Sequence, residues 1–320
     1  MENVRMTDNS LPDVPRLRLL SEVARQGSLA GAARTIGISS SAVSQQISIL
    51  EREAGVKLLD RSPRGVGLTG AGEILVEHAR RILRLLEATR AEMDQLSGEL
   101  AGRVRIGAIP SVARFVLLPV AESLAADAPD IELTVNVIEP AESIDLLLGG
   151  ALDVAIIDLY DNVPMAFPDY LHTTELLHEP LVLVAPPSYE LPQKVRLADL
   201  KNEPWVMPDE LGACGQAVRF ACRSEGFEPN VRWHTADLLL LVESISRGRG
   251  ISVLPPLSID RGVAPVTIHS LDRPHLGRRV LAVTRAADER RPIVRAVLDE
   301  IRQAAATQKA VIEAAATAGN

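Results

Sequence analysis

Apolar residues at helical spacing dominate the first part of the chain. They recur every three or four positions, as in amphipathic helices whose apolar side faces a core. The first predicted helix carries Leu17, Leu20 and Val23. A second begins after Ser28 and a third after Ser39, because serine is favoured at helix N-caps. The pattern predicts three short helices in succession.

The third predicted helix has two different sides. Its apolar side carries Val43, Ile47 and Leu50. The other side is almost free of charge and consists of Ser40, Ser41, Ser44, Gln45 and Ser48. Two short helices joined by a three-residue turn, with such a stripe on the second, are typical of a helix-turn-helix. Taken alone, such a stripe is more often a plain solvated helix face, and it is the surrounding pattern that favours the helix-turn-helix.

Two short strands are predicted next, over residues 57–61 and 66–68. The turn between them, Ser62-Pro63-Arg64-Gly65, suits proline at its second position and glycine at its last. This hairpin would place Arg61 and Arg64 beside the third helix. Gly65, Gly67 and Gly70 also match GxGxxG, but the polar run before them is no buried strand, so a dinucleotide site is not predicted.

A long amphipathic helix is predicted over residues 73–100. Its seam positions are separated by alternating steps of four and three residues, as in coiled coils. They are Leu75, Ala79, Ile82, Leu86, Thr89, Met93, Leu96 and Leu100, of which only Thr89 is polar. Such a seam is covered either by its own domain or by a second copy, and its length favours dimerisation.

After residue 102 short β-branched runs alternate with helical segments. Strands are predicted at 104–109, 131–138 and 154–157, with helices at 111–126 and 142–148 between them. The alternation continues to a strand at 279–284 and a helix from 290 to about 306, followed by an Ala-rich tail at 307–320. Residues 103–306 therefore read as an α/β unit, which we expect to have two lobes.

The composition fits a globular protein of more than one domain. The chain has 320 residues, of which 47% are hydrophobic and 24% charged. Met1 to Asp13 lacks the apolar stretch of a signal peptide, and no run reaches the roughly 18 apolar residues of a membrane span. A cytoplasmic protein with no membrane partner is expected.

The net charge of -8 is unevenly distributed. Residues 12–72 carry eight Lys and Arg against five Asp and Glu, a balance of +3, whereas residues 73–320 carry a balance of -10. The acidic average therefore does not exclude DNA binding by the first segment.

Few residues indicate metal or catalytic chemistry. Cys214 and Cys222 form no CxxC pair, and the six histidines show no ligand spacing, so neither a metal nor another cofactor is predicted. The chain lacks GxSxG and Walker motifs, which argues against those enzyme classes. A solute-binding protein would share the α/β half but would require export.

Several motifs resemble the LysR-type transcriptional regulators. In the N-terminal segment the likeness is carried by residues 28–33, 38–47, 50–51 and 68–72. Downstream, Gly-Ala-Leu-Asp-Val-Ala-Ile at 150–156 and Gly-Arg-Gly-Ile-Ser-Val-Leu-Pro at 248–255 are similar to the family's effector-domain signatures. The resemblance extends over nearly the whole chain.

The resemblance implies a fold class for each part. Residues 12–72 would form an N-terminal all-α winged helix-turn-helix, and 73–100 a long linker helix that dimerises. Residues 103–306 would form a C-terminal α/β two-lobed effector domain resembling type 2 periplasmic binding proteins. Lobe I would comprise 103–167 and 278–306, and lobe II 168–277. The implied assembly is a homodimer, and a homotetramer made from two dimers.

The same resemblance points to double-stranded DNA as a partner, with RNA polymerase as a further candidate. The residues expected at DNA are Ser39, Ser40, Ser41, Ser44, Gln45, Ser48, Arg61 and Arg64. Family members often carry Gln at position 40 and Arg or Lys at position 45. Because this chain has Ser40 and Gln45 instead, we expect base recognition to depend less on contacts between arginine and guanine. Gln45 can form two hydrogen bonds with adenine.

A small-molecule effector is implied in a cleft between the lobes. The residues expected there are Ile109, Pro110, Ser111, Pro208, Asp209 and Thr235. Ser111 begins a predicted helix whose free N–H groups favour an anion, which suggests a carboxylate metabolite, although a plain N-cap is equally compatible. Cys214 and Cys222 loosely resemble the sensing pair of peroxide-responsive members, but their spacing differs and an incidental pair is expected.

Overall fold

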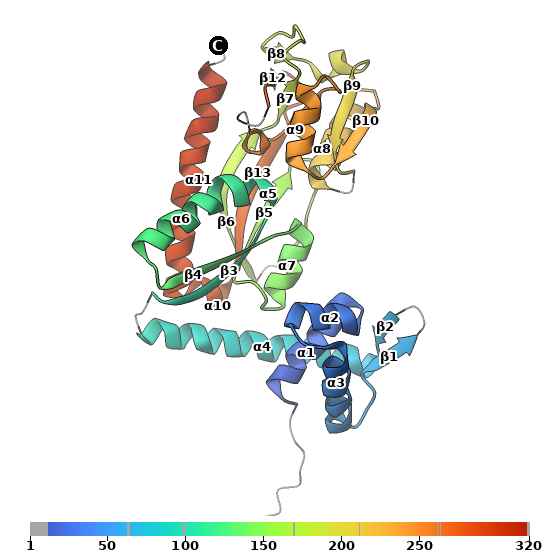
Figure 1. The fold of residues 1–320 in the computed structure, drawn as a ribbon, viewed down its shortest axis with the longest axis vertical. Helices are drawn as coiled ribbons and strands as arrows, with labels where there is room; N and C mark the ends of the chain where they lie inside the picture. Colours follow the sequence, from blue (N-terminus) through green and yellow to red (C-terminus); the bar gives the residue numbers. More distant parts are fainter. Residues whose placement is uncertain are drawn as a thin grey trace, which may run out of the picture. The chain divides into compact units, whose positions relative to one another are not determined.

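The computed structural model describes residues 12–62, 65–97, 100–168, 170–210, 212–260, 262 and 264–318. It divides into two compact units, an N-terminal unit that ends near Met93 and a C-terminal unit (Figure 1). Among the described residues, no helix has both the length and the apolar character needed to cross a bilayer.

The N-terminal unit begins with the predicted helices α1 (Val14–Gln26), α2 (Leu29–Ile36) and α3 (Ser40–Ala54). The Ser28 hydroxyl accepts a hydrogen bond from the Gly31 N–H at 3.0 Å, and the Ser39 hydroxyl accepts one from the Ala42 N–H at 3.2 Å. These bonds satisfy N–H groups that have no partner within the helix. Both predicted N-caps are confirmed.

A wing and a long helix complete this unit. The wing pairs β1 (Leu59–Ser62) with β2 (Gly65–Leu68) in antiparallel fashion, and α4 (Gly70–Ser97) follows. Helices α1, α2, α3 and α4 share one apolar core with the wing. Its fully buried members include Leu20, Val43, Ile47, Leu50 and Ala79. The sequence therefore folds as the expected winged helix-turn-helix.

The first lobe of the C-terminal unit is built on a mixed sheet. Its strands, in spatial order, are β4 (Ile131–Val137), β3 (Gly102–Ala108), β5 (Val154–Tyr160), β13 (Gly277–Arg285) and β6 (Leu171–Pro180). Strand β3 pairs in parallel with β4 and β5, whereas β13 is antiparallel to β5 and β6. Its helical segments are α5 (Pro110–Val112), the π-helical η1 (Ala113–Leu117), α6 (Leu118–Asp127), α7 (Pro140–Leu148), α10 (Ala286–Glu289) and α11 (Pro292–Ala318).

The second lobe contains two sheets. One orders β11 (Ser252–Leu254), β7 (Val182–Ala185), β12 (Thr267–Leu271) and β8 (Lys194–Val195), and the other pairs β9 (Pro204–Pro208) with β10 (Asn230–Thr235). The helical segments are η2 (Leu197–Leu200), α8 (Ala213–Ser224), α9 (Leu238–Ser246) and η3 (Pro256–Ser258). Trp205 is fully buried in this lobe's core. The two-lobed α/β fold class is confirmed.

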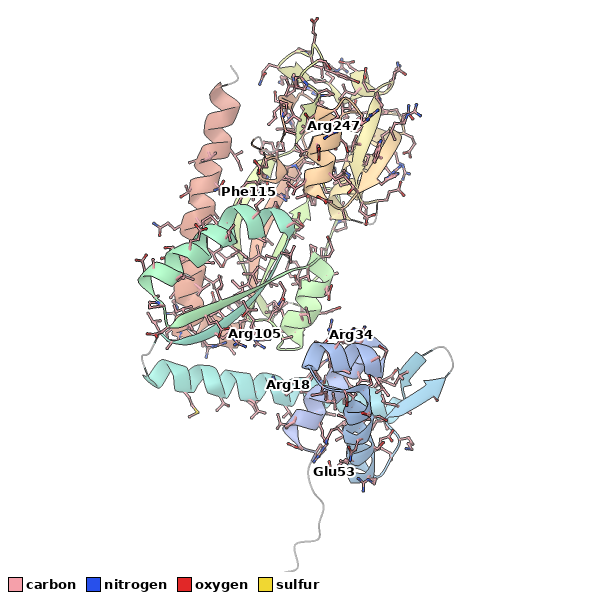
Figure 2. The ribbon with its side chains drawn as sticks, in the orientation of Figure 1. Arg18, Arg34, Glu53, Arg105, Phe115 and Arg247 are labelled. Atoms are coloured by element: carbon pink, nitrogen blue, oxygen red, sulfur yellow. The ribbon has the colours of Figure 1, made fainter. Side chains whose placement is uncertain are left out.

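Asp153, which lies within the 150–156 motif, has a structural role in lobe I. Its carboxylate accepts hydrogen bonds from the backbone N–H of Arg105 at 2.8 Å and from the Arg105 guanidinium at 3.0 Å. Arg105 is labelled in Figure 2. It also accepts one from Arg291 at 2.9 Å. These bonds join the start of β5 to β3 and to the segment before α11, so this aspartate holds lobe I together.

The predicted start of lobe II at residue 168 is wrong. Strand β6 pairs with β13 from Leu171 to Pro180, so it belongs to the sheet of lobe I. The chain passes into the second lobe only at Leu181. This strand contains His172, Glu175, His178 and Glu179, and these polar residues hid it from a search for β-branched runs.

The predicted tail is also wrong, because α11 continues through Ala318. Residues 307–318 are rich in alanine and contain neither glycine nor proline, so a helix already begun by residues packed on lobe I has no local reason to stop. The α/β unit therefore ends in a single long helix.

Glu51 offers a direct test of how the wing is attached. Its buried carboxylate accepts hydrogen bonds from the N–H groups of Leu58 and Leu59 and pairs with Lys57 at 2.7 Å. Glu51→Ala leaves two buried N–H groups without an acceptor, and we expect it to lower the free energy of unfolding of this unit by about 2 to 3 kcal/mol at pH 7. Urea denaturation followed by circular dichroism measures it.

The stabilisation of the N-terminal unit by Glu51 depends on pH. Burial alone would raise the pKa of Glu51, but the bonds from Lys57, Leu58 and Leu59 outweigh it and lower the pKa. The stabilisation is therefore present above the carboxyl's ordinary pKa and lost as pH falls through the lowered one. Asp60→Asn, which changes an exposed carboxylate on β1, is the control. Equal stability of the Asp60→Asn and Glu51→Ala proteins at pH 7 would contradict this account.

Candidate DNA interface and effector cleft

The polar stripe of α3 faces away from the core. Ser40, Ser41, Gln45 and Ser48 are exposed and Ser44 is half-buried, whereas Val43 and Ile47 on the other side are fully buried. The caps at both ends and the apolar contacts fix the orientation of this helix. The stripe is therefore presented to solvent on a rigid element.

Some hydroxyls of the stripe already have local partners. Ser39 Oγ caps α3 and lies 2.9 Å from Ser41 Oγ, and Ser48 Oγ donates to the Ser44 carbonyl oxygen at 2.9 Å. The Gln45 amide makes no hydrogen bond with the described residues. Gln45 is thus the side chain of the stripe best able to bind an external partner, whereas Ser39 acts first as a cap.

Of the two arginines predicted beside the stripe, the structure describes only Arg61. Arg61 lies in β1, opposite Val66 of β2. Arg64 lies outside the described residues.

The predicted seam of α4 has two sections. Ala79 is 0% exposed and half-buried Leu75 packs against the core of the same unit, so the first section is covered within the chain. Ile82, Leu86 and Met93 are 42%, 45% and 65% exposed. The side chain of Leu96 lies outside the described part. The exposed apolar section of α4 therefore begins at Ile82.

One cavity of about 100 Å³ lies between the lobes. All the residues expected at the effector line it, and these are Ile109, Pro110, Ser111, Pro208, Asp209 and Thr235. They come from the segment after β3, the end of β9 and the end of β10. The structure brings these residues together, and their role in binding stays a prediction.

Another cavity, of about 310 Å³, shares Pro110 and Ser111 with the first. Its lining is mainly apolar and includes Phe115 on η1, labelled in Figure 2, and Val242 on α9. Arg114, also in the lining, pairs with Asp260, and its guanidinium carbon lies 5.4 Å from the centre of the Phe115 ring. The two cavities therefore form a polar and an apolar part of one cleft.

A buried arginine, which the sequence analysis missed, lies in the lining of the smaller cavity. Arg278 is 2% exposed and donates to Glu179 Oε1 from Nε, at 2.9 Å, and from Nη2. Its Nη1 lies 3.1 Å from Ser111 Oγ and 3.4 Å from Asp158 Oδ2. Ser111 is therefore bonded to a buried cation rather than exposed as a free cap.

Carboxylates outnumber cations in this lining. Glu139, Asp158 and Asp209 face Arg278 among the described residues that line the smaller cavity. Burial raises the pKa of Glu139, and the charges of Asp158 and Asp209 raise it further. The described lining of the smaller cavity therefore contains three carboxyl groups and one guanidinium.

Both cysteines are free thiols. Cys214 lines the smaller cavity and Cys222 is buried, and they form no disulfide. Burial raises the pKa of each thiol to about 12, although a hydrogen bond with Tyr160 opposes the rise for Cys214. Thiols with such pKa values stay protonated near neutral pH and react slowly. Within the described chain, no group of three or more His, Cys, Asp or Glu is placed to hold a metal.

Comparison with known families matches both units. Residues 15–73 match the bacterial regulatory helix-turn-helix proteins of the lysR family, and residues 97–306 match the LysR substrate binding domain. The HTH-type regulator YnfL of Escherichia coli K12, itself uncharacterised, is 30% identical over 250 residues, which are 76% of this chain and 82% of that protein. A probable hydrogen peroxide-inducible genes activator of Mycobacterium avium is 30% identical over 87% of this chain and 90% of its own length.

Solved structures share the same architecture. A full-length OxyR variant from Pseudomonas aeruginosa superposes with a TM-score of 0.67 at 24% identity, over 92% of this chain and 95% of that one. Full-length BenM gives a TM-score of 0.54 at 21% identity, over 92% and 97% of the two chains. The chain therefore belongs to the LysR family and is a DNA-binding transcriptional regulator with a C-terminal effector-binding domain, not an enzyme.

Proposed function

We propose that this regulator binds duplex DNA as a dimer, reads bases with the exposed stripe of α3, and is controlled by an effector held between the lobes. The observation that carries the proposal is the uncharged serine and glutamine face of α3, held outward by a fully buried apolar side. Since DNA is its target, we place the regulator in the cytoplasm. RNA polymerase is a further partner if the regulator activates transcription.

Base recognition by Gln45 follows from this arrangement. A glutamine can form two hydrogen bonds with adenine, worth about 1 to 3 kcal/mol of discrimination against other bases. Ser40, Ser41, Ser44 and Ser48 are short enough to reach phosphates and base edges along the same face. Arg61 and Arg64 of the wing would then supply phosphate contacts.

The experiment for DNA recognition uses duplexes selected by the wild-type protein from a random library. We expect Gln45→Ala to lose preference at one base position by about 1 to 3 kcal/mol, with an unchanged salt slope because no charge is removed. Gel-shift titrations against single-base variants measure it. Gln303→Ala, an exposed glutamine on α11, is the matched control. If Gln45→Ala keeps the wild-type preference at every position, α3 is not the reading element.

The exposed section of α4 supports dimerisation. Ile82, Leu86 and Met93, together with Leu85 at 69% exposure, leave apolar surface uncovered on one side of the helix. A second copy of α4 would cover it and place another α3 on the DNA. Pairing of two dimers into a tetramer is part of the same proposal.

A charge placed in this seam tests the dimer. We expect Leu86→Glu to shift the protein to monomers in sedimentation velocity and to weaken operator binding at least tenfold, because a glutamate cannot be buried unpaired in an apolar seam. Arg80→Glu places the same residue on another side of α4 and should keep the wild-type assembly. A Leu86→Glu protein that sediments as wild type would rule out this seam.

Peroxide sensing by a thiol pair is not part of the proposal, although relatives include a probable hydrogen peroxide-inducible genes activator. The raised pKa values of Cys214 and Cys222 argue against a reactive thiolate. After mild peroxide treatment we expect mass spectrometry of the native protein to show two free thiols, and denatured protein treated alike serves as the reactive control. A Cys214–Cys222 disulfide formed in the native protein would contradict this.

A further inference from the structure

The charge balance of the cleft depends first on the buried Arg278. Its guanidinium is bound by Glu179, whose side chain is 0% exposed and whose other oxygen accepts a hydrogen bond from the Leu257 N–H at 2.8 Å. The positive charge is thus compensated from behind the cavity. Because Glu179 neutralises Arg278, this arginine offers no excess positive charge to an anion in the cleft.

Asp158 adds a carboxylate to the lining of the same cavity. It is 9% exposed and lines the cavity. Among the described residues only its Oδ2 has a hydrogen-bond partner, the Arg278 Nη1 at a long 3.4 Å, and Oδ1 has none. Asp158 Oδ1 is not among the fully buried oxygens of the described chain that lack a partner, so it is open to the cavity. A hydrogen-bond donor of a ligand could therefore reach it.

Glu139 and Asp209 place two more carboxylates around the same space, from the segment before α7 and the segment after β9. The pKa of Glu139 is raised, first by burial and then by the charges of Asp158 and Asp209. A positive charge between these groups would be stabilised by all three. A carboxylate there would be opposed by them.

A metal ion is a poor occupant of this space. Nowhere in the described chain are three or more His, Cys, Asp or Glu side chains arranged as metal ligands. The adjoining cavity is also apolar, with Phe115, Leu238, Leu239 and Val242 in its lining. Asp260, the acid of that lining nearest to Arg114, is already paired with it. The cleft as a whole therefore matches a molecule with a cationic end and an apolar body.

We propose that the effector is an organic cation, an amine or guanidine whose charged group lies among Glu139, Asp158 and Asp209 while its hydrocarbon part lies against Phe115 and Val242. The inference rests on the proposed function of this cleft as the effector site. It replaces the carboxylate metabolite suggested by the sequence.

The test compares probes of equal length and different charge on the full-length protein. Hexylamine, hexanoate and 1-hexanol are titrated by calorimetry and by ligand-observed NMR. We expect hexylamine to bind at least tenfold more tightly than hexanoate, with 1-hexanol between them. Equal or tighter binding of hexanoate, or no binding of hexylamine, would overturn the inference.

Variants locate the charge effect in the cleft. Glu139→Gln removes one carboxylate without changing shape and should weaken hexylamine binding about three- to tenfold while leaving hexanoate unchanged or tighter. Asp145→Asn removes an exposed carboxylate from α7, outside the cavity lining, and should change neither. Equal weakening of hexylamine binding in both variants, or unchanged hexylamine binding in Glu139→Gln, would also overturn the inference. DNA binding by the wild-type protein is measured in a separate experiment. A failure of the proposed function is thereby distinguished from a failure of the inference about the effector's charge.

Discussion

The cleft is organised by one buried ion pair. Arg278 and Glu179 are direct neighbours across β13 and β6, at the place where both strands leave the first lobe. A buried guanidinium that lost its carboxylate would cost about 3 to 5 kcal/mol, so the pair fixes the register of these strands. Glu179 also holds the Leu257 N–H of η3, and Arg278 holds Ser111 after β3. Hydrogen bonds thus connect the walls of the cleft to Arg278, whose charge Glu179 already neutralises. On our proposal, Glu139, Asp158 and Asp209 then determine which ligands the cleft attracts.

A buried carboxylate plays a comparable part in the N-terminal unit. Glu51 binds the N–H groups at the start of the wing, as Glu179 binds the N–H of Leu257. In both units a charged side chain inside the fold accepts hydrogen bonds from backbone N–H groups of core leucines, which the apolar contacts alone leave without an acceptor. The consequence for function is the same in each unit. Exposed Gln45 of α3 and cavity-lining Asp158 of β5 both belong to ordered elements, so neither has to be ordered when a partner binds.

Local signals explain which features could be predicted from the sequence. Ser28 and Ser39 act as caps through bonds to residues three positions away, so the short helices were evident. Strand β6 was missed because Glu179 is an acidic residue that looks exposed, although its partner Arg278, 99 positions later, keeps it buried. The charge of the cleft was missed for the same reason. Glu139, Asp158, Asp209 and Arg278 come from separate segments, and only strand register and lobe packing bring them together.

Charge also offers a physical route from ligand to conformation. Glu139 and Asp158 belong to the first lobe, whereas Asp209 follows β9 of the second. Like charges on opposite walls oppose closure of the cleft, and a cation between them converts that repulsion into attraction for both walls. Such a ligand binds the closed arrangement better than the open one, which is the condition for a ligand to shift the equilibrium between the two. A neutral molecule of equal shape would leave the repulsion in place, so the charge of the effector, rather than its bulk, would determine how strongly the lobes respond.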